Sequence, residues 1–361
     1  MAGLPALRRL PRLALAPVLA LMLAGCSGGG ASSTGDAKGP VTVGYQGIVN
    51  PWKVAIQSKA FSKATGRELR WRRFSSGSEV ITALASGDLD LAVAGSSPIA
   101  TATSRGLDVE LIWIMEAIRD GEALVARKDS GIKTVKDLKG KTVGVPFAST
   151  THYHLLVALG DAGLTTKDLK ILDLQPDTIL ASWTQKHIDA AFVWSPVLDK
   201  LKAEGTVVMT SGALADKGRP TFDGLLCRKA FGKSDPGFLA TFLSIIARAD
   251  ADYREKGQSW TPESKEIKAI SALSGAAPKD CVAILGQYAY PSLDEQTSET
   301  WLGGGKTGGA AKALAQTAKF LKEQKAIQTL HADYSGFVNA SYAEAAKTVQ
   351  TQPKSADKSG S

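Results

Sequence analysis

Short apolar segments alternate with amphipathic segments along most of the chain, and this alternation predicts strands that are each followed by a helix. The segment VTVGY at 41–45 alternates as a strand does, and Pro51 stands where the first turn of a helix tolerates proline, opening a helix that runs to about residue 64. The same pattern predicts further strands at 69–74, 91–95, 109–115 and 122–127, with helices at 77–86 and 98–103. Strands that alternate with helices indicate βαβ units and a largely parallel sheet.

A second alternation begins near residue 128 and predicts another α/β layer. Its strands are expected at 141–146, 170–174 and 190–194, and its helices at 134–138, 150–161, 176–185 and 195–202. After a strand at 222–228, long amphipathic helices are predicted at 235–256, 263–273, 279–287 and 310–322. We therefore expect two α/β lobes: 41–127 with 223–345 as the first, and 128–222 as the second, inserted lobe. Residues 346–361 contain few apolar side chains and are expected to form a frayed tail.

The first 25 residues are typical of an export signal. Three arginines, at positions 8, 9 and 12, precede an apolar run from Leu13 to Leu23, which is the order of a signal peptide. The sequence Leu-Ala-Gly-Cys that ends at Cys26 resembles a bacterial lipobox, in which the cysteine receives lipid and becomes the new N-terminus. The alternative is an ordinary secretion signal with an incidental cysteine. Residues 26–40 are small and polar, so they are expected to form a flexible tether.

Composition narrows the classes of protein that fit. The 361 residues are 44% hydrophobic and 22% charged, close to the soluble globular average. The apolar run near the N-terminus is shorter than the roughly 20 residues of a spanning helix, which excludes a polytopic membrane protein. The formal charge of +8 falls to +5 without the three arginines of the leader. This charge is modest and no basic helix is interleaved with aromatic residues, so we expect no nucleic-acid binding.

The remaining cysteines and histidines do not predict a metal site. Cys227 and Cys281 could form a disulfide or stay as two buried thiols, and the sequence leaves both open. His152 and His154 are two residues apart, so a helix would point them in different directions. The segment 303–307 resembles the end of a P-loop, but Thr300 stands where that motif needs glycine. We expect neither a metal, nor a cofactor, nor an enzyme.

Two lobes of this kind form the architecture of periplasmic solute-binding proteins, and several segments resemble the taurine-binding branch of that family. The resemblance covers about residues 41 to 345. Its segments are GYQ (44–46), SGSEVITALASGDLDLAVAGSSP (76–98), EALV (122–125), DLKGKTVGVPFASTTHYHLL (137–156), LQPDTILASW (174–183), DAAFVWSPV (189–197), RPTFD (219–223) and AKFLKEQ (318–324). SSP, STTHY and VWSP are specific only in combination. The lipobox departs from the family, whose best-known members are free in the periplasm.

The resemblance implies a two-lobe (type II) binding-protein fold, each lobe a mostly parallel sheet flanked by helices, with a hinge between them. It implies a monomer that captures taurine between the lobes and delivers it to the permease and ATPase of an ABC importer. The location would be the periplasm or cell envelope, with a lipid anchor at Cys26. Two alternatives stay open: a receptor for other aliphatic sulfonates or related small solutes, and a ligand-sensing adaptor for a signalling partner.

For the sulfonate, the sequence offers hydroxyl groups where strands are followed by helices. Ser96 and Ser97 follow the strand at 91–95, and Thr150 and Thr151 follow the strand at 141–146. Ligands of α/β sheets lie beyond the carboxyl ends of strands, and helix N-termini are anion sites. The alternative is that these residues are ordinary helix N-caps. Gln46, at the end of the first strand, could add an amide donor or be a plain loop residue.

For the ammonium, Glu122 and Asp223 lie close to the expected crossovers between the lobes. A carboxylate that faces a cleft stabilises a cation, although two solvated surface acids are the simpler reading of such a pair. Trp194 could place its indole face against the ammonium, or could be a core residue. Closure is expected about a hinge near 126–128 and 221–225, and the ligand would stabilise the closed form because it contacts both lobes.

Overall fold

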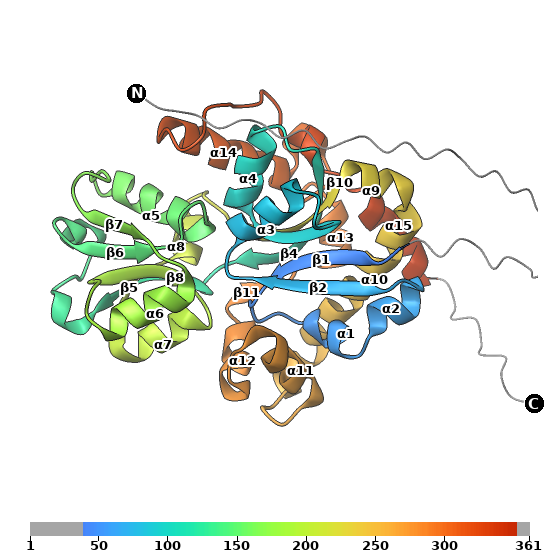
Figure 1. Cartoon of the computed structure of the whole chain (residues 1–361), viewed down its shortest axis with the longest axis horizontal. Helices are drawn as coiled ribbons and strands as arrows, with labels where there is room; N and C mark the ends of the chain where they lie inside the picture. The colour runs from blue at the N-terminus through green and yellow to red at the C-terminus, as the bar shows by residue number, and fades with distance from the viewer. Residues whose placement is uncertain (1–38, 352–361) are drawn as a thin grey trace, which may run out of the picture. The chain divides into compact units, whose positions relative to one another are not determined.

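The computed structural model of the chain describes residues 39–351 and contains two β-sheets (Figure 1). The expected signal peptide, Cys26, the tether as far as residue 38 and residues 352–361 lie outside the described residues. None of the described helices is both long enough and apolar enough to cross a bilayer.

The first sheet has six strands in the order β11-β4-β10-β3-β1-β2. Their bounds are β1 (Val41–Gln46), β2 (Leu69–Phe74), β3 (Leu91–Gly95), β4 (Val109–Ile118), β10 (Phe222–Arg228) and β11 (Tyr288–Ala289). β1 pairs in parallel with β2 and β3, whereas β10 runs antiparallel between β3 and β4. The chain therefore returns to the middle of the first sheet after it has built the second.

The second sheet has five strands in the order β7-β6-β8-β5-β9. Their bounds are β5 (Glu122–Arg127), β6 (Thr142–Val145), β7 (Lys170–Asp173), β8 (Ala190–Trp194) and β9 (Gly205–Thr210). β6 pairs in parallel with β7 and β8, while β5 runs antiparallel to both β8 and β9. Below, the first lobe means residues 39–118 and 222–351, and the second lobe means residues 122–215.

Helices accompany both sheets. The first lobe contains α1 (Lys53–Gln57), α2 (Ala60–Thr65), α3 (Gly77–Ala85), α4 (Ser96–Ser104), α9 (Lys229–Ser234), α10 (Pro236–Lys256), α11 (Lys265–Ser274), α12 (Pro278–Leu285), α13 (Leu293–Thr297), α14 (Gly309–Glu323) and α15 (Ser341–Thr351). The second contains α5 (Thr150–Asp161), α6 (Pro176–Thr184), α7 (Val197–Glu204) and α8 (Ser211–Ala215). Short 3₁₀ turns lie at 128–130, 135–138, 257–259, 305–307 and 335–337.

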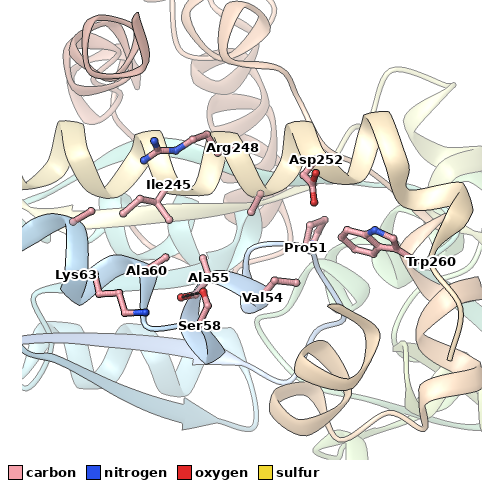
Figure 2. Close-up of a pocket in the computed structure, with 12 residues that line it drawn as sticks. Pro51, Val54, Ala55, Ser58, Ala60, Lys63, Ile245, Arg248, Asp252 and Trp260 are labelled. Carbon is pink, nitrogen blue, oxygen red and sulfur yellow. Dashed lines mark hydrogen bonds between the residues drawn. The ribbon is translucent and has the colours of Figure 1, made fainter. Parts of the chain in front are cut away.

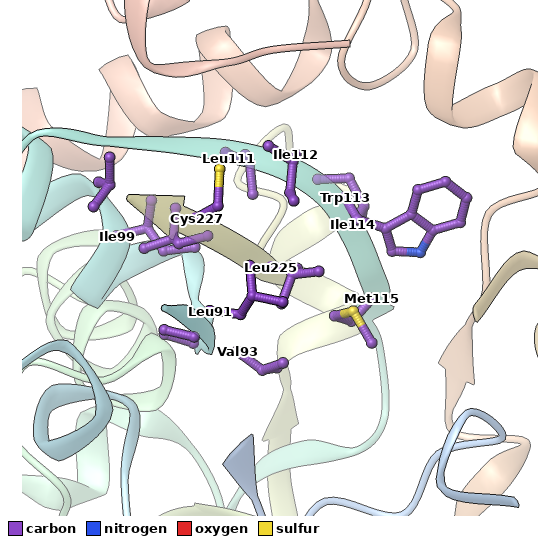
Figure 3. Packing of buried hydrophobic residues seen from close by; sticks show 14 of the residues in the cluster. Leu91, Val93, Ile99, Leu111, Ile112, Trp113, Ile114, Met115, Leu225 and Cys227 are labelled. Carbon is purple, nitrogen blue, oxygen red and sulfur yellow. The ribbon is translucent and has the colours of Figure 1, made fainter. Parts of the chain in front are cut away.

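The core of the first lobe forms where the central strands bury both faces. All five residues of β3 are buried, as are six of the seven in β10. Figure 3 shows Leu91 and Val93 of β3, Leu225 of β10 and Leu111 of β4 packed together. Strands that are buried on both faces read as continuous apolar runs, which is why the sequence pattern identified them.

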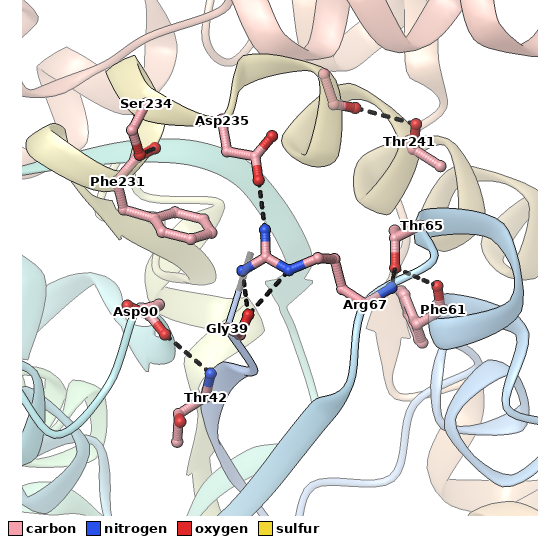
Figure 4. A network of polar contacts seen from close by, with 11 residues as sticks. Gly39, Thr42, Phe61, Thr65, Arg67, Asp90, Phe231, Ser234, Asp235 and Thr241 are labelled. Carbon is pink, nitrogen blue, oxygen red and sulfur yellow. Dashed lines mark hydrogen bonds and ion pairs between the residues drawn. The ribbon is translucent and has the colours of Figure 1, made fainter. Parts of the chain in front are cut away.

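A polar network ties the start of the described chain to the first lobe (Figure 4). The Arg67 guanidinium donates to the Gly39 carbonyl and pairs with Asp235 at 2.6 Å. The Thr42 backbone N–H donates to Asp90 at 3.0 Å, and Asp90 also pairs with Arg228. These contacts lie at the amino ends of β1, β2 and β3, so the carboxyl ends of these strands are free of them.

Two of the expected boundaries are wrong. Residues 122–127, expected in the first lobe, form β5 of the second sheet, so the chain crosses between the sheets at 119–121 and returns at 216–221. The apolar run alone could not say which sheet β5 joins. The tail was expected from residue 346, but residues 346–351 belong to α15, because the alanines at 343 and 346 are buried and the helix packs on α10.

The two described cysteines are free thiols and both are buried. Cys227 lies among the apolar residues of the main first-lobe core, whereas Cys281 belongs to a separate cluster to which α11 and α12 contribute. Burial raises the pKa of Cys227 to about 12. Of the two alternatives that the sequence leaves open, the structure shows the buried thiols.

Candidate functional site

A small cavity of about 20 Å³ lies where the carboxyl ends of strands from the two sheets face each other. Its lining comes from both lobes: Gln46, Ile48, Gly77, Gly95, Pro98, Asp223 and Tyr288 from the first, and Glu122, Ser149, Thr150 and Trp194 from the second. A cavity of this size has room for about one water molecule. The lobes must therefore separate before a larger molecule can enter.

Five of the eight side chains expected at the site line this cavity. They are Gln46, Glu122, Thr150, Trp194 and Asp223, and all five are buried. Ser96, Ser97 and Thr151 are buried but do not line it. The roles of all eight in binding stay predictions.

The three side chains that do not line the cavity have structural surroundings of their own. The Ser96 hydroxyl accepts a hydrogen bond from the Phe222 backbone N–H at 3.4 Å, which joins α4 to β10. The Thr151 hydroxyl lies 2.7 Å from that of Ser149, the N-cap of α5. The Ser97 hydroxyl is buried without a hydrogen-bond partner.

The two lobes approach each other closely at Gly95, the residue before α4. A Cβ atom at this position would lie 2.8 Å from the Cγ2 atom of Thr150 and 3.3 Å from Asp223 Oδ1. The first distance is shorter than van der Waals contact allows, so a side chain here would push α5 of the second lobe away. Glycine therefore lets the N-terminal ends of α4 and α5 meet at the cavity.

Asp223 is joined to a buried polar cluster in the first lobe. Its carboxyl group hydrogen-bonds that of Glu116, and Asn50 Nδ2 donates to both Glu116 oxygens at 3.3 and 3.5 Å. Lys53 Nζ donates to Asn50 Oδ1 at 2.9 Å. Burial raises the pKa of Asp223 to about 6, against the lowering effects of Glu116 and Lys53.

The charges in this cluster depend on one another. Burial, together with the charge of Asp223, raises the pKa of Glu116 well above its ordinary value. Burial lowers the pKa of Lys53 to about 7, and the neighbouring carboxylates oppose this. The Lys53 ammonium also lies 4.8 Å from the Trp52 ring centroid and 5.4 Å from that of Tyr45, which favours the charged form.

Neither Lys53 nor Glu116 was expected from the sequence. Lys53 stands in the first turn of a predicted helix, where a solvated lysine is ordinary. Glu116 offered a signal, because it is a charged residue directly after the apolar run 111–115 in a strand whose residues are almost all buried. A buried acid in such a strand needs a partner.

On the second-lobe side, Glu122 is held by two hydroxyl groups. The Thr150 hydroxyl donates to Glu122 Oε1, and the Ser211 hydroxyl lies 3.0 Å from Oε2. Burial and, to a smaller extent, the nearby charge of Asp223 raise the pKa of Glu122 to about 8, although both hydroxyls lower it. Trp194 is the partner of Glu122 in the β5–β8 register, which places both at the same edge of the sheet.

Further contacts join the two lobes. Gln287, before β11, accepts from the Ser195 hydroxyl at 2.9 Å and donates to Asp199 at 3.0 Å, both in the second lobe. Tyr153 of α5 meets Phe320 of α14 edge to face, with centroids 5.4 Å apart. These contacts stabilise the arrangement in which the two lobes leave only a small cavity between them.

A larger cavity of about 520 Å³ lies elsewhere in the first lobe, between α1, α2 and α10 (Figure 2). Val54, Ala55, Ile245 and other apolar side chains form much of its lining, with Lys63 on an exposed edge. It lacks the convergent buried carboxyl and hydroxyl groups of the smaller cavity. Because specific ligand sites combine apolar walls with a few placed polar groups, the smaller cavity is the better candidate.

Comparisons with known proteins bear on the fold and on the kind of ligand. The model of the NMT1/THI5-like family matches residues 54–257. The chain is 35% identical over 304 residues to the taurine-binding periplasmic protein of Escherichia coli K12, covering 84% of this chain and 92% of that one. It is 28% identical to a putative aliphatic sulfonates-binding protein of Bacillus subtilis, covering 63% of this chain and 69% of the relative.

Among solved structures, the alkanesulfonate-binding protein SsuA from Xanthomonas axonopodis pv. citri, bound to MOPS, superposes with a TM-score of 0.67. The match covers 86% of this chain and 99% of that one, at 21% sequence identity, so it bears on the fold. The predicted fold class of two α/β lobes is confirmed by this likeness and by the two sheets of the structure.

Proposed function

We propose that the chain captures taurine between its two lobes. It belongs to the NMT1/THI5-like family and is a periplasmic solute-binding protein of the sulfonate, nitrate and taurine type. Its relatives are solute-binding proteins, and the chain is a binding protein rather than an enzyme. The observation that carries the choice of ligand is that two buried carboxyl groups, Glu122 and Asp223, face one cavity from opposite lobes.

Two such carboxyl groups favour a cation in the cavity. Taurine carries an ammonium at one end, and a buried carboxylate without a positive partner is costly. The Trp194 indole at the same cavity adds an aromatic face, which is suited to the ammonium or to the two methylene groups. An ammonium between Glu122 and Asp223 would also join the lobes, because each lobe contributes one of the two carboxyls.

The sulfonate end needs donors rather than positive charge. No side chain caps the first turn of α4, and the N-cap of this helix, Gly95, lines the cavity. Backbone N–H groups at a helix N-terminus stabilise anions. The buried Ser97 hydroxyl in the same turn has no protein partner. The N-terminal end of α5, with Ser149 and Thr150 at the cavity, offers the second set of donors.

The partners follow from the class of protein. We propose that the closed form docks on the permease of an ABC importer whose ATPase drives uptake of taurine as a sulfur source. The chain would work in the periplasm or at the cell envelope, held to a membrane by a lipid on Cys26. The alternative function is sensing instead of transport, in which the closed form docks on a signalling partner.

Calorimetry separates the two ends of the ligand. The purified protein, unfolded and refolded to remove any solute carried through purification, is titrated with taurine and then with ethanesulfonate, which lacks the amine. Taurine should bind at least about tenfold more tightly, because ethanesulfonate leaves a buried carboxylate without a counter-ion. Equal affinity would mean that the carboxyl groups lie outside the binding determinants.

A second candidate is a receptor for aliphatic sulfonates without an amine. It is favoured by the Bacillus subtilis relative, whose name gives aliphatic sulfonates as its ligands. Tighter binding of ethanesulfonate than of taurine would select it. Absence of binding by either compound would leave only the family.

A further inference from the structure

An unbroken chain of hydrogen-bonding groups leads from the cavity into the second lobe. Thr150 donates to one oxygen of Glu122, and the other oxygen lies 3.0 Å from Ser211 Oγ. Ser211 Oγ lies 2.7 Å from His154 Nδ1, and His154 Nε2 lies 2.9 Å from the Arg219 carbonyl oxygen. Ser211 and His154 are fully buried and Glu122 is 3% exposed. No role in binding was expected for Ser211 or His154.

The number of protons in this chain follows from its geometry. The Arg219 carbonyl can only accept, so His154 Nε2 carries a hydrogen. If the imidazole is neutral, Nδ1 accepts the only hydroxyl hydrogen of Ser211. Ser211 Oγ then has only lone pairs to offer Glu122, whose Oε2 must supply a hydrogen. A carboxylate beside a neutral imidazole would leave one contact of the chain without a hydrogen.

The alternative arrangement contains the same number of protons. If Ser211 donates to an ionised Glu122, then Nδ1 of His154 must donate to Ser211 and the imidazole is charged. Burial favours the neutral pair, because it lowers the pKa of His154 to about 4 and raises that of Glu122 to about 8. At neutral pH the extra proton therefore lies on Glu122.

The groups around the chain are consistent with a neutral Glu122. Asp223 of β10 and the Tyr288 hydroxyl of β11 face it from the first lobe, and neither is a cation. Thr150 of α5 and Trp194 of β8 face it from the second lobe. Around His154 lie the Tyr153 and Phe192 rings and the backbone of Arg219.

We propose that the Glu122–Ser211–His154 chain holds one dissociable proton and that an organic ammonium displaces it on binding. This inference rests on the proposed function, since taurine supplies the ammonium. The positive group enters beside Glu122, the Glu122 O–H bond breaks, and the proton passes to the solvent buffer. Ser211, left without a hydrogen from Glu122, turns its own hydrogen to the new carboxylate. His154 and Ser211 are thus positioning residues.

The exchange gives the cleft a way to recognise positive charge. Before binding, Glu122 is neutral, so Asp223 has no second negative charge beside it. A sulfonate without an amine does not displace the proton and meets a neutral carboxyl group. Because one proton leaves as taurine binds, affinity should rise about tenfold per pH unit below the pKa of Glu122 and level off near pH 8.

The first test counts protons. Taurine is titrated calorimetrically at pH 7 in phosphate and in Tris, whose heats of ionisation differ, so that the dependence of the heat on buffer gives the protons released. We expect about one for taurine and about none for ethanesulfonate. Tight taurine binding without proton release overturns the inference and leaves the proposed function standing.

The second test needs no ligand and so is independent of the proposed function. The infrared carbonyl band of a protonated carboxyl group is followed in the refolded protein while the pH is raised from 6 to 9. A band that disappears near pH 8 in the wild-type chain and is missing in Glu122→Gln supports the inference. If the difference between the two chains shows no such band, the inference is wrong whether or not taurine binds.

The third test addresses His154 as a positioning residue. His154→Leu removes the acceptor from Ser211, which then donates to Glu122, so the pH at which taurine affinity levels off should fall by about one unit. His154→Asn loses the same bond to Arg219 but keeps an acceptor at the Nδ1 position, and should keep the wild-type profile. If taurine affinity depends on pH in the same way in His154→Leu and His154→Asn, the histidine has a structural role only. If His154→Leu does not fold, the infrared test decides.

Discussion

Asp223 in the first lobe and Glu122 in the second lie at the same cavity, and they are 4% and 3% exposed. Their neighbours differ. Behind Asp223 lie a second carboxyl group, Glu116, and a buried ammonium, Lys53. Behind Glu122 lie two hydroxyls and an imidazole whose pKa is lowered by burial.

Burial alone does not fix the charge of a carboxyl group. Both groups have a raised pKa, but the pKa of Asp223 stays near 6, whereas that of Glu122 reaches about 8. The hydrogen bond with Glu116 and, to a smaller extent, the charge of Lys53 lower the pKa of Asp223 against the effect of burial. At neutral pH the first-lobe wall of the cleft is negative and the second-lobe wall is neutral.

The largest expected effect comes from removing the cation of the first lobe. Burial lowers the pKa of Lys53 to about 7, so the unfolded chain keeps a proton there that the folded chain loses above pH 7. Between pH 7 and 10 the free energy of unfolding of the wild type should therefore rise by about 3 to 4 kcal/mol more than that of Lys53→Met. Urea denaturation measures this. Lys63→Met, at an exposed position of α2, is the matched control and should change stability by less than about 0.5 kcal/mol. If stability depends on pH in Lys53→Met just as it does in the wild type, burial does not lower the pKa of Lys53.

The second effect is on the pH dependence of stability. Because the folded state raises the pKa of Glu122 to about 8, the folded chain binds a proton that the unfolded chain has lost. This contribution is complete below the ordinary pKa of about 4.5 and is lost as the pH rises through 8. Glu122→Gln should therefore gain about 2 to 3 kcal/mol relative to wild type between pH 5 and 8.

The same denaturation series carries its own control. Glu323→Gln replaces an exposed glutamate at the end of α14 and should keep the wild-type slope over this range. If the stability of Glu122→Gln changes with pH just as that of the wild type does, Glu122 is ionised over the whole range from pH 5 to 8.

The third effect concerns ligand affinity in the first lobe. Asp223→Asn keeps the shape of the side chain but removes the charge, so taurine should bind about 30-fold more weakly, or about 2 kcal/mol, while ethanesulfonate should lose little. Calorimetry at pH 7 measures both. Asp161→Asn, exposed at the end of α5, should bind both as the wild type does. A parallel loss for both ligands would contradict a cation contact at Asp223.

The smallest effect is expected at the contact between the lobes. Gln287→Ala removes the hydrogen bonds to Ser195 and Asp199, so the closed form should lose about 1 kcal/mol and taurine affinity about fivefold. Gln324→Ala, exposed after α14, is the control. An unchanged affinity in Gln287→Ala would mean that these bonds persist in the open form.

The sequence predicted the positions of strands well where they bury both faces. The strands at 190–194 and 222–228 and the helix at 150–161 have the predicted bounds. The half-exposed strand β9 at the edge of the second sheet was missed, because its side chains do not separate clearly into apolar and polar faces. The sheet to which β5 belongs depends on pairing with β8 and β9, which no local pattern contains.

The site could be predicted in part, for a physical reason. Gln46, Trp194 and Asp223 stand at strand ends, and strand ends that meet at one edge of a sheet can be read from the alternation. Ser211 and His154 come together only through the packing of α5 against α8. The sequence suggests no role for His154 except as a metal ligand, because it does not reveal a partner 57 residues away.

The two thiols, each enclosed in a separate hydrophobic cluster, bear on how the chain is produced outside the cytoplasm. Within residues 39–351, folding requires no oxidase to form a cross-link and no isomerase to correct one. A thiol whose pKa is raised to about 12, as at Cys227, is scarcely nucleophilic at neutral pH. The stability of this part of the chain should therefore be indifferent to the redox poise of its surroundings, in oxygenated and anoxic growth alike.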